Sequence, residues 1–226
     1  MEVLADALKK KSHSLSEYDS KRVLQEYGIP VTRERLVRGQ KDAVAAAEEI
    51  GYPVVIKATG PELTHKTEMD AIRLNLADAK SVRQAVRELK EATKGEKIQG
   101  LVVQEMVKGR RELVLGLIRD PQFGPCVMFG LGGIYTEILR DVSFRVAPLS
   151  ERDALEMMDE IRGKKILDAV RGMAAADRQA LAESLVALGR IGMDQDEVKE
   201  IDVNPMILTG EGRPVAVDAL VVLKSQ

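Results

Sequence analysis

Apolar and polar residues follow two kinds of pattern along this chain. Short runs of β-branched and other apolar residues, typical of strands, alternate with stretches in which apolar residues recur every three or four positions, as on one face of a helix. The first pattern predicts strands at 31–37, 54–58, 71–76 and 101–107, and the second predicts helices at 17–27, 41–50 and 78–92. The first half of the chain is therefore expected to mix helices and strands.

Capping residues mark both ends of the first of these helices. Ser16 precedes the helix and Asp19 follows three residues later, so the serine oxygen can accept an otherwise unpaired N–H of the first turn. Gly28 can adopt the left-handed conformation that ends many helices, and Pro30 prevents continuation. Residues 1–16 are polar and rich in lysine, and we expect them to form an N-terminal extension.

The second half of the chain is richer in strands. The patterns predict strands at 113–118, 125–131 and 142–146, helices at 151–161 and 177–190, and a final hairpin with arms at 200–208 and 214–223 around a turn at 210–212. The change of pattern near Gly109 predicts an α+β fold of two lobes, 17–107 and 108–226, with a ligand cleft between them.

Composition excludes several classes of function. The 226 residues carry 34 Lys and Arg against 36 Asp and Glu, a net charge of −2, and only 3% are aromatic. Nucleic-acid binding needs basic charge gathered on one face or aromatic platforms for bases, so no nucleic-acid partner is expected. Cys126 is the single cysteine, which excludes an internal disulfide.

The sequence also carries no sign of export or membrane insertion. No apolar stretch reaches the length of about 18 residues that a bilayer crossing requires. No charged segment followed by an apolar one opens the chain. We therefore expect a cytoplasmic protein without a membrane partner.

Two strand ends carry residues suited to a nucleotide. Lys57 closes the apolar run that starts at Val54, and a cation there suits a phosphate, although strand-end lysines often mark only where a strand reaches solvent. Residues 104–107 close another apolar strand, whose main chain can meet a purine edge. Glu105 and Glu112 are candidate contacts or, alternatively, solvated strand-edge carboxylates.

Three glycines lie within residues 130–133, directly after an apolar strand. Because glycine has no side chain, the backbone N–H groups of such a segment can approach an anion closely. The spacing is not that of a dinucleotide-binding motif or a P-loop, and a tight turn between strands would use the same residues.

The final hairpin carries the strongest physical signal. Asp202 and Asn204 lie two apart on a predicted strand and so share a face, and Asp218 on the other arm can be a cross-strand neighbour of Asn204. Mg²⁺ prefers a few such oxygen ligands, with water and phosphate completing its shell. A hydrogen-bonded structural cluster is the alternative.

Two histidines occur, His13 in the polar extension and His65 in a loop shortly after Lys57. Histidine can act as a nucleophile toward phosphorus. A lone loop histidine is also a common surface residue, so His65 gains significance only from its surroundings.

Seven short motifs carry a more specific signal through their order. They are Val55-Ile56-Lys57-Ala58, His65-Lys66-Thr67, Gln104-Glu105-Met106-Val107, Arg119-Asp120-Pro121-Gln122-Phe123-Gly124-Pro125, Phe129-Gly130-Leu131-Gly132-Gly133-Ile134-Tyr135, Asp141-Val142-Ser143-Phe144-Arg145 and Glu200-Ile201-Asp202-Val203-Asn204-Pro205. Over nearly the whole chain this order resembles an ATP-grasp fold. It is most similar to the β subunit of the nucleoside-diphosphate-forming acyl-CoA synthetases, in the superfamily of the succinyl-CoA synthetase β subunit.

The resemblance implies a reversible acid–CoA ligase reaction, in which acyl-CoA, ADP and phosphate give acid, CoA and ATP. A separate α subunit would carry the CoA-binding and acyl-phosphate domains, so a hetero-oligomer is expected. The implied roles are phosphate contact by Lys57, adenine contact by Glu105 and the Val107 backbone, ribose contact by Glu112, Mg²⁺ binding by Asn204 and Asp218, the phosphoryl path along Gly132, Gly133 and Arg145, phosphoryl transfer through His65, and support of the phosphohistidine by Asp202.

The sequence departs from the family pattern after His65. Asp70 and Ala71 stand where relatives usually have two glycines, and Arg110 stands where they often have another. Since non-glycine residues restrict the backbone, an alternative function stays open: a regulatory module that senses ATP and ADP without transferring phosphate. A stand-alone carboxylate–amine ligase is a third possibility, for which the chain has little room.

Overall fold

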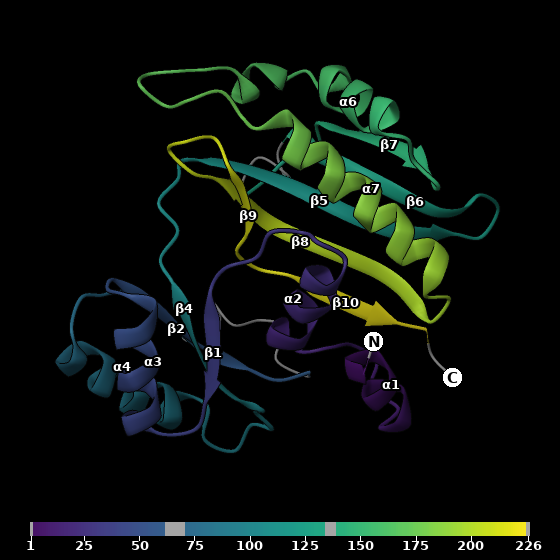
Figure 1. Ribbon diagram of the computed structural model, residues 1–226. Coiled ribbons are helices and arrows are strands. Elements are labelled where there is room, and N and C mark those ends of the chain that lie inside the picture. The colour runs from purple at the N-terminus through teal and green to yellow at the C-terminus, as the bar shows by residue number, and fades with distance from the viewer. Residues whose placement is uncertain (1, 62–70, 134–138, 225–226) are drawn as a thin grey trace. The chain divides into compact units, whose positions relative to one another are not determined.

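A computed structural model describes residues 2–61, 71–133 and 139–224 (Figure 1). The chain divides into two compact units, one formed by residues 1–13, 20–31 and 107–226 and the other by residues 14–19 and 32–106. The change of unit at 106 and 107 falls beside the lobe boundary expected from the sequence. The start of the chain differs, because residues 1–13 and 20–31 group with the second half.

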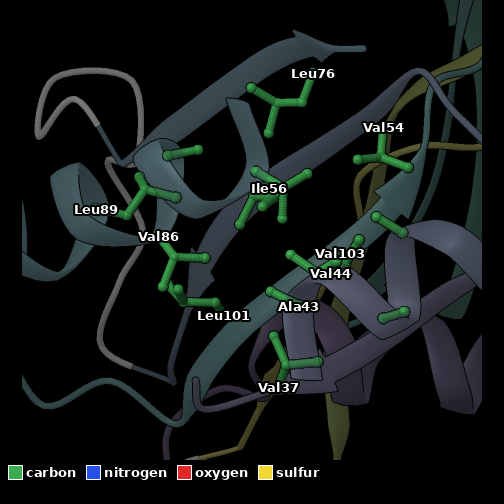
Figure 2. Close-up of a cluster of buried hydrophobic side chains, with 14 of the residues drawn as sticks. Val37, Ala43, Val44, Val54, Ile56, Leu76, Val86, Leu89, Leu101 and Val103 are labelled. Carbon is green, nitrogen blue, oxygen red and sulfur yellow. The ribbon is translucent and has the colours of Figure 1, made fainter. Parts of the chain in front are cut away.

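The smaller unit is a four-stranded antiparallel sheet with two helices on one face. In chain order its elements are β1 (Glu34–Val37), α3 (Gln40–Ile50), β2 (Val54–Thr59), β3 (Ile72–Leu76), α4 (Ala79–Ala92) and β4 (Gly100–Glu105), and the strand order is β1-β4-β2-β3. Figure 2 shows the core, where Ile56 and Val103 from the sheet meet Val44 of α3 and Val86 of α4. Side chains alternate along β2, so Val55 and Lys57 point to the face of the sheet opposite α3 and α4.

The larger unit is a six-stranded antiparallel sheet. Its elements are α1 (Glu2–Lys9), most of α2 (Glu17–Glu26), β5 (Arg111–Asp120), β6 (Gly124–Leu131), β7 (Val142–Val146), α6 (Glu151–Glu160), the 3₁₀ turn η1 (Lys164–Leu167), α7 (Arg178–Asp194), β8 (Val198–Leu208), β9 (Pro214–Ala216) and β10 (Leu220–Leu223). The strands are ordered β10-β8-β5-β6-β7. β9 also pairs with β8, at residues 206–208, whereas β10 pairs with β8 at residues 198–202.

Helices α6 and α7 cover one face of the larger sheet (Figure 1). Glycines of α7 let this helix pack closely against the sheet. A Cβ at Gly192 would lie 2.7 Å from Leu117 Cδ1 of β5, and one at Gly189 would lie 3.7 Å from Val127 Cγ2 of β6. Leu117 and Val127 are therefore on the helix-covered face. Their neighbours Gly116 and Met128 face the other way, where no helix of α6 or α7 lies.

Local signals explain the boundaries of the elements. The Ser16 oxygen accepts the Asp19 N–H at 3.1 Å and Gly28 has φ of +85°, so the capping residues predicted for α2 are confirmed. Asp78 and Ser150 cap α4 and α6 through reciprocal bonds with Ser81 and Asp153.

Two expectations from the sequence need correction. The extension predicted at 1–16 contains a helix, α1, whose apolar stripe includes the buried residues Leu4 and Ala7. The neighbouring lysines made this stripe hard to recognise in the sequence. The second arm of the final hairpin is two strands, β9 and β10, separated by residues 217–219. Within the described residues, none of the helices combines the length and apolar content needed to cross a bilayer.

We predict that Leu89→Ala lowers the free energy of unfolding by about 2 to 5 kcal/mol, because Leu89 is fully buried on α4 and its removal leaves a cavity. Leu74→Ala is the control, since Leu74 in the same unit is 58% exposed and its loss should change stability by less than about 1 kcal/mol. Urea unfolding followed by circular dichroism measures both. Equal losses would contradict the core assignment.

Candidate functional site

Asn204 and Asp218 stand opposite each other in a gap between two strand pairings. β8 pairs with β9 from Met206 opposite Ala216, and with β10 from Asp202 opposite Leu220. These two pairings belong to one register, which continues through the gap and sets Asn204 opposite Asp218. The hairpin pattern in the sequence predicted this cross-strand relation.

The glycine segment after β6 lies beside Asn204. Gly133 N–H donates to Asn204 Oδ1 at 3.2 Å, and Gly132 N–H donates to the Glu112 carbonyl at 2.9 Å. A Cβ at Gly132 would lie 2.5 Å from the Leu113 carbonyl oxygen, and a Cβ at Gly133 would collide with the Glu112 carboxylate. Glycine is therefore required at both positions, and the structure brings Glu112, the glycines and the Asn204–Asp218 pair together.

Asp202 lies on β8 opposite Gly116 of β5, on the face away from α6 and α7. Burial, together with the charges of Glu200 and Asp218, raises the pKa of the Asp202 carboxyl to about 6. Because Asp218 contributes to this shift, its carboxylate lies close enough to Asp202 to repel it. The larger unit thus gathers negative charge at one place on this face.

The donor set at this place fits a magnesium ion. Asn204 and Asp218 offer oxygen ligands, and a cation between them would offset the repulsion that raises the pKa of Asp202. Over residues 2–61, 71–133 and 139–224, no three His, Cys, Asp or Glu side chains gather to enclose a metal. A site with few protein ligands leaves positions for water and phosphate, as Mg²⁺ prefers.

Arg145 is not brought to this cluster. It pairs with Val127 across β6 and β7, so it lies on the helix-covered face, opposite to that of Asp202. Its guanidinium donates to both carboxylate oxygens of Glu160 on α6, through Nη1 at 2.9 Å and through Nη2. The Glu160 carboxylate also raises the pKa of Arg145. The structure therefore ties Arg145 to helix packing and not to the phosphoryl path expected from the sequence.

Lys57 lies in a buried ion pair of the smaller unit. β2 extends to Thr59, so Lys57 is not at the strand end that the sequence indicated. Its ammonium donates to Glu17 Oε1 at 2.8 Å, and the two side chains are only 6% and 1% exposed. A pair buried this deeply fixes the position of the ammonium on the face of the sheet that α3 and α4 leave uncovered.

The end of β4 is tied to the strand beside it. Glu105 accepts the Arg33 N–H at 2.8 Å and Arg33 Nε at 2.9 Å, so its carboxylate is engaged by Arg33. Val107 follows in the stretch between β4 and β5. His65 and the rest of 62–70 lie outside the described residues.

Three polar residues of α2 were not predicted from the sequence to be buried: Glu17, Ser20 and Lys21. All three are buried, and with Leu24 they follow the spacing of one helix face, at i, i+3, i+4 and i+7. The sequence signal was that these polar residues lie on the same helix face as the apolar residue Leu24. Charged residues at such positions are usually solvated, which is why the pattern was not recognised.

Comparison with known proteins gives a consistent result. The ATP-grasp domain family matches residues 6–223. The β subunit of ADP-forming acetate–CoA ligase I from Pyrococcus furiosus is 41% identical over 224 residues, which cover 97% of this chain and 96% of that protein.

Solved structures agree. The dinucleotide-forming acetyl-coenzyme A synthetase 1 of Ca. Korarchaeum cryptofilum, in complex with coenzyme A, Ca-AMPCP and HgCl+, matches with a TM-score of 0.94 and 43% identity over 99% of each chain. A second structure of that name, with coenzyme A and Mg-AMPPCP and the phosphohistidine segment pointing towards the nucleotide binding site, matches with a TM-score of 0.88 at 43% identity, again over 99% of each chain.

We predict that Glu17→Gln lowers the free energy of unfolding by about 3 to 5 kcal/mol, because the Lys57 ammonium would remain buried without its counter-charge. Glu49→Gln is the matched control, since Glu49 pairs with Arg35 at 2.6 Å in the same unit but both side chains are more than half exposed. That change should cost less than about 1 kcal/mol. Equal costs in urea unfolding would show that burial does not strengthen the Glu17–Lys57 pair.

We predict that Asp202→Asn stabilises the metal-free protein more at pH 8 than at pH 5. A carboxyl whose pKa rises from 3.8 unfolded to about 6 folded favours the folded state when protonated, and this stabilisation is lost as the pH rises through 6. The full loss is about 3 kcal/mol, of which about 1 kcal/mol falls between pH 5 and pH 8. Urea unfolding in EDTA at both pH values measures it, and a difference independent of pH would contradict it.

Proposed function

This chain belongs to the ATP-grasp family, and on that premise we propose that it is the nucleotide-binding β subunit of an ADP-forming acid–CoA ligase. The family resemblance and the α+β ATP-grasp fold that the sequence motifs indicated are confirmed by the match over residues 6–223 and by the Korarchaeum structures. Its homologues are the β subunits of ADP-forming acetate–CoA ligases, and they cover nearly its whole length.

One observation carries the proposal at the level of chemistry. The Gly133 N–H donates to the Asn204 amide oxygen beside the Glu112 carboxylate, and Asn204 stands opposite Asp218 at the gap between β9 and β10, two residues along β8 from Asp202. Phosphoryl transfer needs positioned donors, a cation and metal charge more than it needs covalent machinery. A backbone donor next to paired oxygen ligands supports that chemistry.

Each proposed site residue has a physical task. The Glu112 carboxylate would accept hydrogen bonds from the ribose hydroxyls, and Asn204 with Asp218 would hold Mg²⁺. Gly132 and Gly133, whose N–H groups donate to the Glu112 carbonyl and to Asn204 Oδ1, would line the phosphoryl path and keep Asn204 in place. When bound there, the metal ion would neutralise phosphate charge. Lys57 would contact a phosphate by sharing its ammonium with Glu17.

The adenine would meet the main chain at the end of β4. Because the Glu105 carboxylate is engaged by Arg33, its side chain would shape this region, while the carbonyl of Glu105 and the N–H of Val107 would read the base edge. Main-chain recognition of this kind needs a rigid strand end, which the Arg33 contacts provide.

The proposed reaction moves one phosphoryl group. The N–P bond of a phosphohistidine breaks while a bond forms between phosphorus and a terminal oxygen of the ADP β-phosphate, giving ATP and neutral histidine; the reverse reaction regenerates phosphohistidine. His65 is the proposed carrier on this chain, with Asp202 supporting its charged form. The acyl-phosphate step and the CoA thioester would belong to a partner α subunit.

One sequence feature favours the regulatory alternative. Ala71, which replaces a family glycine, is fully buried in the core of the smaller unit, and its carbonyl accepts the Ala58 N–H at 2.9 Å. A nucleotide-sensing module would need no swinging segment after His65. The two functions differ in whether phosphate becomes attached to His65.

We predict that the purified chain, incubated with Mg-ATP labelled in the γ-phosphate and an α subunit, acquires acid-labile, base-stable phosphate on histidine. His65→Ala should abolish the label, whereas His13→Ala should keep it, because these are the two histidines of the chain and His13 is exposed. A wild-type chain that acquires no label would favour the regulatory module, and a label that persists in His65→Ala would contradict the assignment of His65 as the carrier.

The same proteins test the subunit assignment. We expect little CoA-thioester formation from the chain with Mg-ATP, CoA and acid until the α subunit is added. Robust ligase activity of the chain alone would contradict the proposal that the CoA-binding and acyl-phosphate domains belong to a partner.

A further inference from the structure

Two buried polar side chains near the start of α2 bind the segment that carries Asp218. Lys21 Nζ donates to the Val217 carbonyl at 3.3 Å, and Ser20 Oγ accepts the Val221 N–H at 3.1 Å. Ser20 is 0% and Lys21 1% exposed, and Lys21 is among the largest fully buried side chains of the protein. The two bonds lie on either side of Asp218.

This segment lies between two strands. β9 ends at Ala216 and β10 begins at Leu220, so Asp218 belongs to neither ladder. Pro205 on β8 stands opposite Val217 in the shared register and has no N–H to donate, and its carbonyl accepts the Val217 N–H at 3.0 Å. The Lys21 and Ser20 side chains therefore add to the main-chain contacts that hold this segment.

The Lys21 contact bears directly on Asp218. The carbonyl that Lys21 binds belongs to the peptide bond joining Val217 to Asp218, so a shift of that carbonyl rotates the backbone from which the carboxylate projects. Burying lysine is costly, and a residue with no effect on the site would be easier to accommodate as an apolar side chain.

We propose that Ser20 and Lys21 are positioning residues of the nucleotide site, which hold the peptide between Val217 and Asp218 so that the Asp218 carboxylate faces Asn204. The inference rests on the proposed function, because it assigns Asp218 to the metal ion that accompanies the nucleotide. Neither side chain touches the reacting groups; both act through Asp218.

Binding of Mn²⁺, as a spectroscopic substitute for Mg²⁺, to the ADP complex of the chain tests this. The free Mn²⁺ signal in electron paramagnetic resonance gives the metal affinity, and isothermal titration in EDTA gives the affinity for ADP alone. Lys21→Met and Ser20→Ala should weaken Mn²⁺ binding about tenfold or more, as loss of a residue supporting a metal ligand commonly does, and should leave metal-free ADP binding unchanged. Lys21→Arg keeps the charge and the donors and should restore most of the affinity.

Two further variants separate a positioning role from general damage. Lys199→Met makes the same substitution at an exposed position of β8 and should bind Mn²⁺ like the wild type. Asp218→Asn should lose affinity itself, and adding Lys21→Met to it should cause no further loss, because both changes remove one contribution. Values are scaled to the folded fraction from circular dichroism, and Ser20→Ala provides the test if Lys21→Met does not fold.

The possible failures are distinguishable. If Asp218→Asn weakens Mn²⁺ binding but Lys21→Met and Ser20→Ala do not, the positioning role is overturned and the proposed function stands. Additive losses in the double variant would likewise overturn action through Asp218. If the wild type binds no Mn²⁺ with ADP, or if Asp218→Asn binds it normally, the metal assignment in the proposed function is overturned and the inference with it.

Discussion

The register of β8 determines where the acidic side chains of the larger unit lie. β8 is paired on both sides, with β5 on one and with β9 and β10 on the other, so it has no free edge along which to slide. Its alternate residues Ile201 and Val203 are 1% and 0% exposed. A slip by one residue would exchange these side chains with Asp202 and Asn204, exposing apolar surface and burying charge. Hydrophobic burial on one face thus positions the polar chemistry on the other.

The protein keeps charges in buried places by two different arrangements. In the smaller unit, Lys57 and Glu17 form an ion pair whose partners restrain each other. In the larger unit, Asp202 is half-buried, and loss of solvent together with repulsion by Glu200 and Asp218 raises its pKa. The first arrangement favours a fixed structure, whereas the second is favourable only when a proton or a cation arrives. Perturbed groups of the second kind are common at functional sites, where local stability is given up for binding.

Much of the fold followed from sequence because the local and the tertiary preferences agree. In α3, α4 and β5 to β7 the spacing of apolar residues matches the residues that are buried, and caps or glycines mark the ends. The turn of the final hairpin is likewise marked by glycines. The exception at α1 comes from a short apolar stripe among lysines. The break at 217–219 was not predicted, because apolar residues continue along the arm on both sides of it.

The site was predictable where its geometry is local and not where it is tertiary. The pairing of Asn204 with Asp218 followed from the hairpin register, and the glycines were singled out by their density; their roles in the site stay proposals. Arg145 was assigned by motif alone, and no sequence pattern could show that its partner is Glu160 on the covered face. Glu17 and Lys21 escaped for the opposite reason, because a polar helix face is ordinarily solvated and only the folded chain reveals what packs against it.

The Glu17–Lys57 pair also bears on how a reversible enzyme can turn over. If Lys57 contacts a phosphate as proposed, the anion would meet an ammonium whose charge Glu17 already partly compensates, and it would gain less than from an unpaired lysine. Weaker attraction lets a nucleotide leave as readily as it enters. An enzyme that must release ATP in one direction and ADP in the other gains from such moderation, because tight binding of either product would make its departure the slow step.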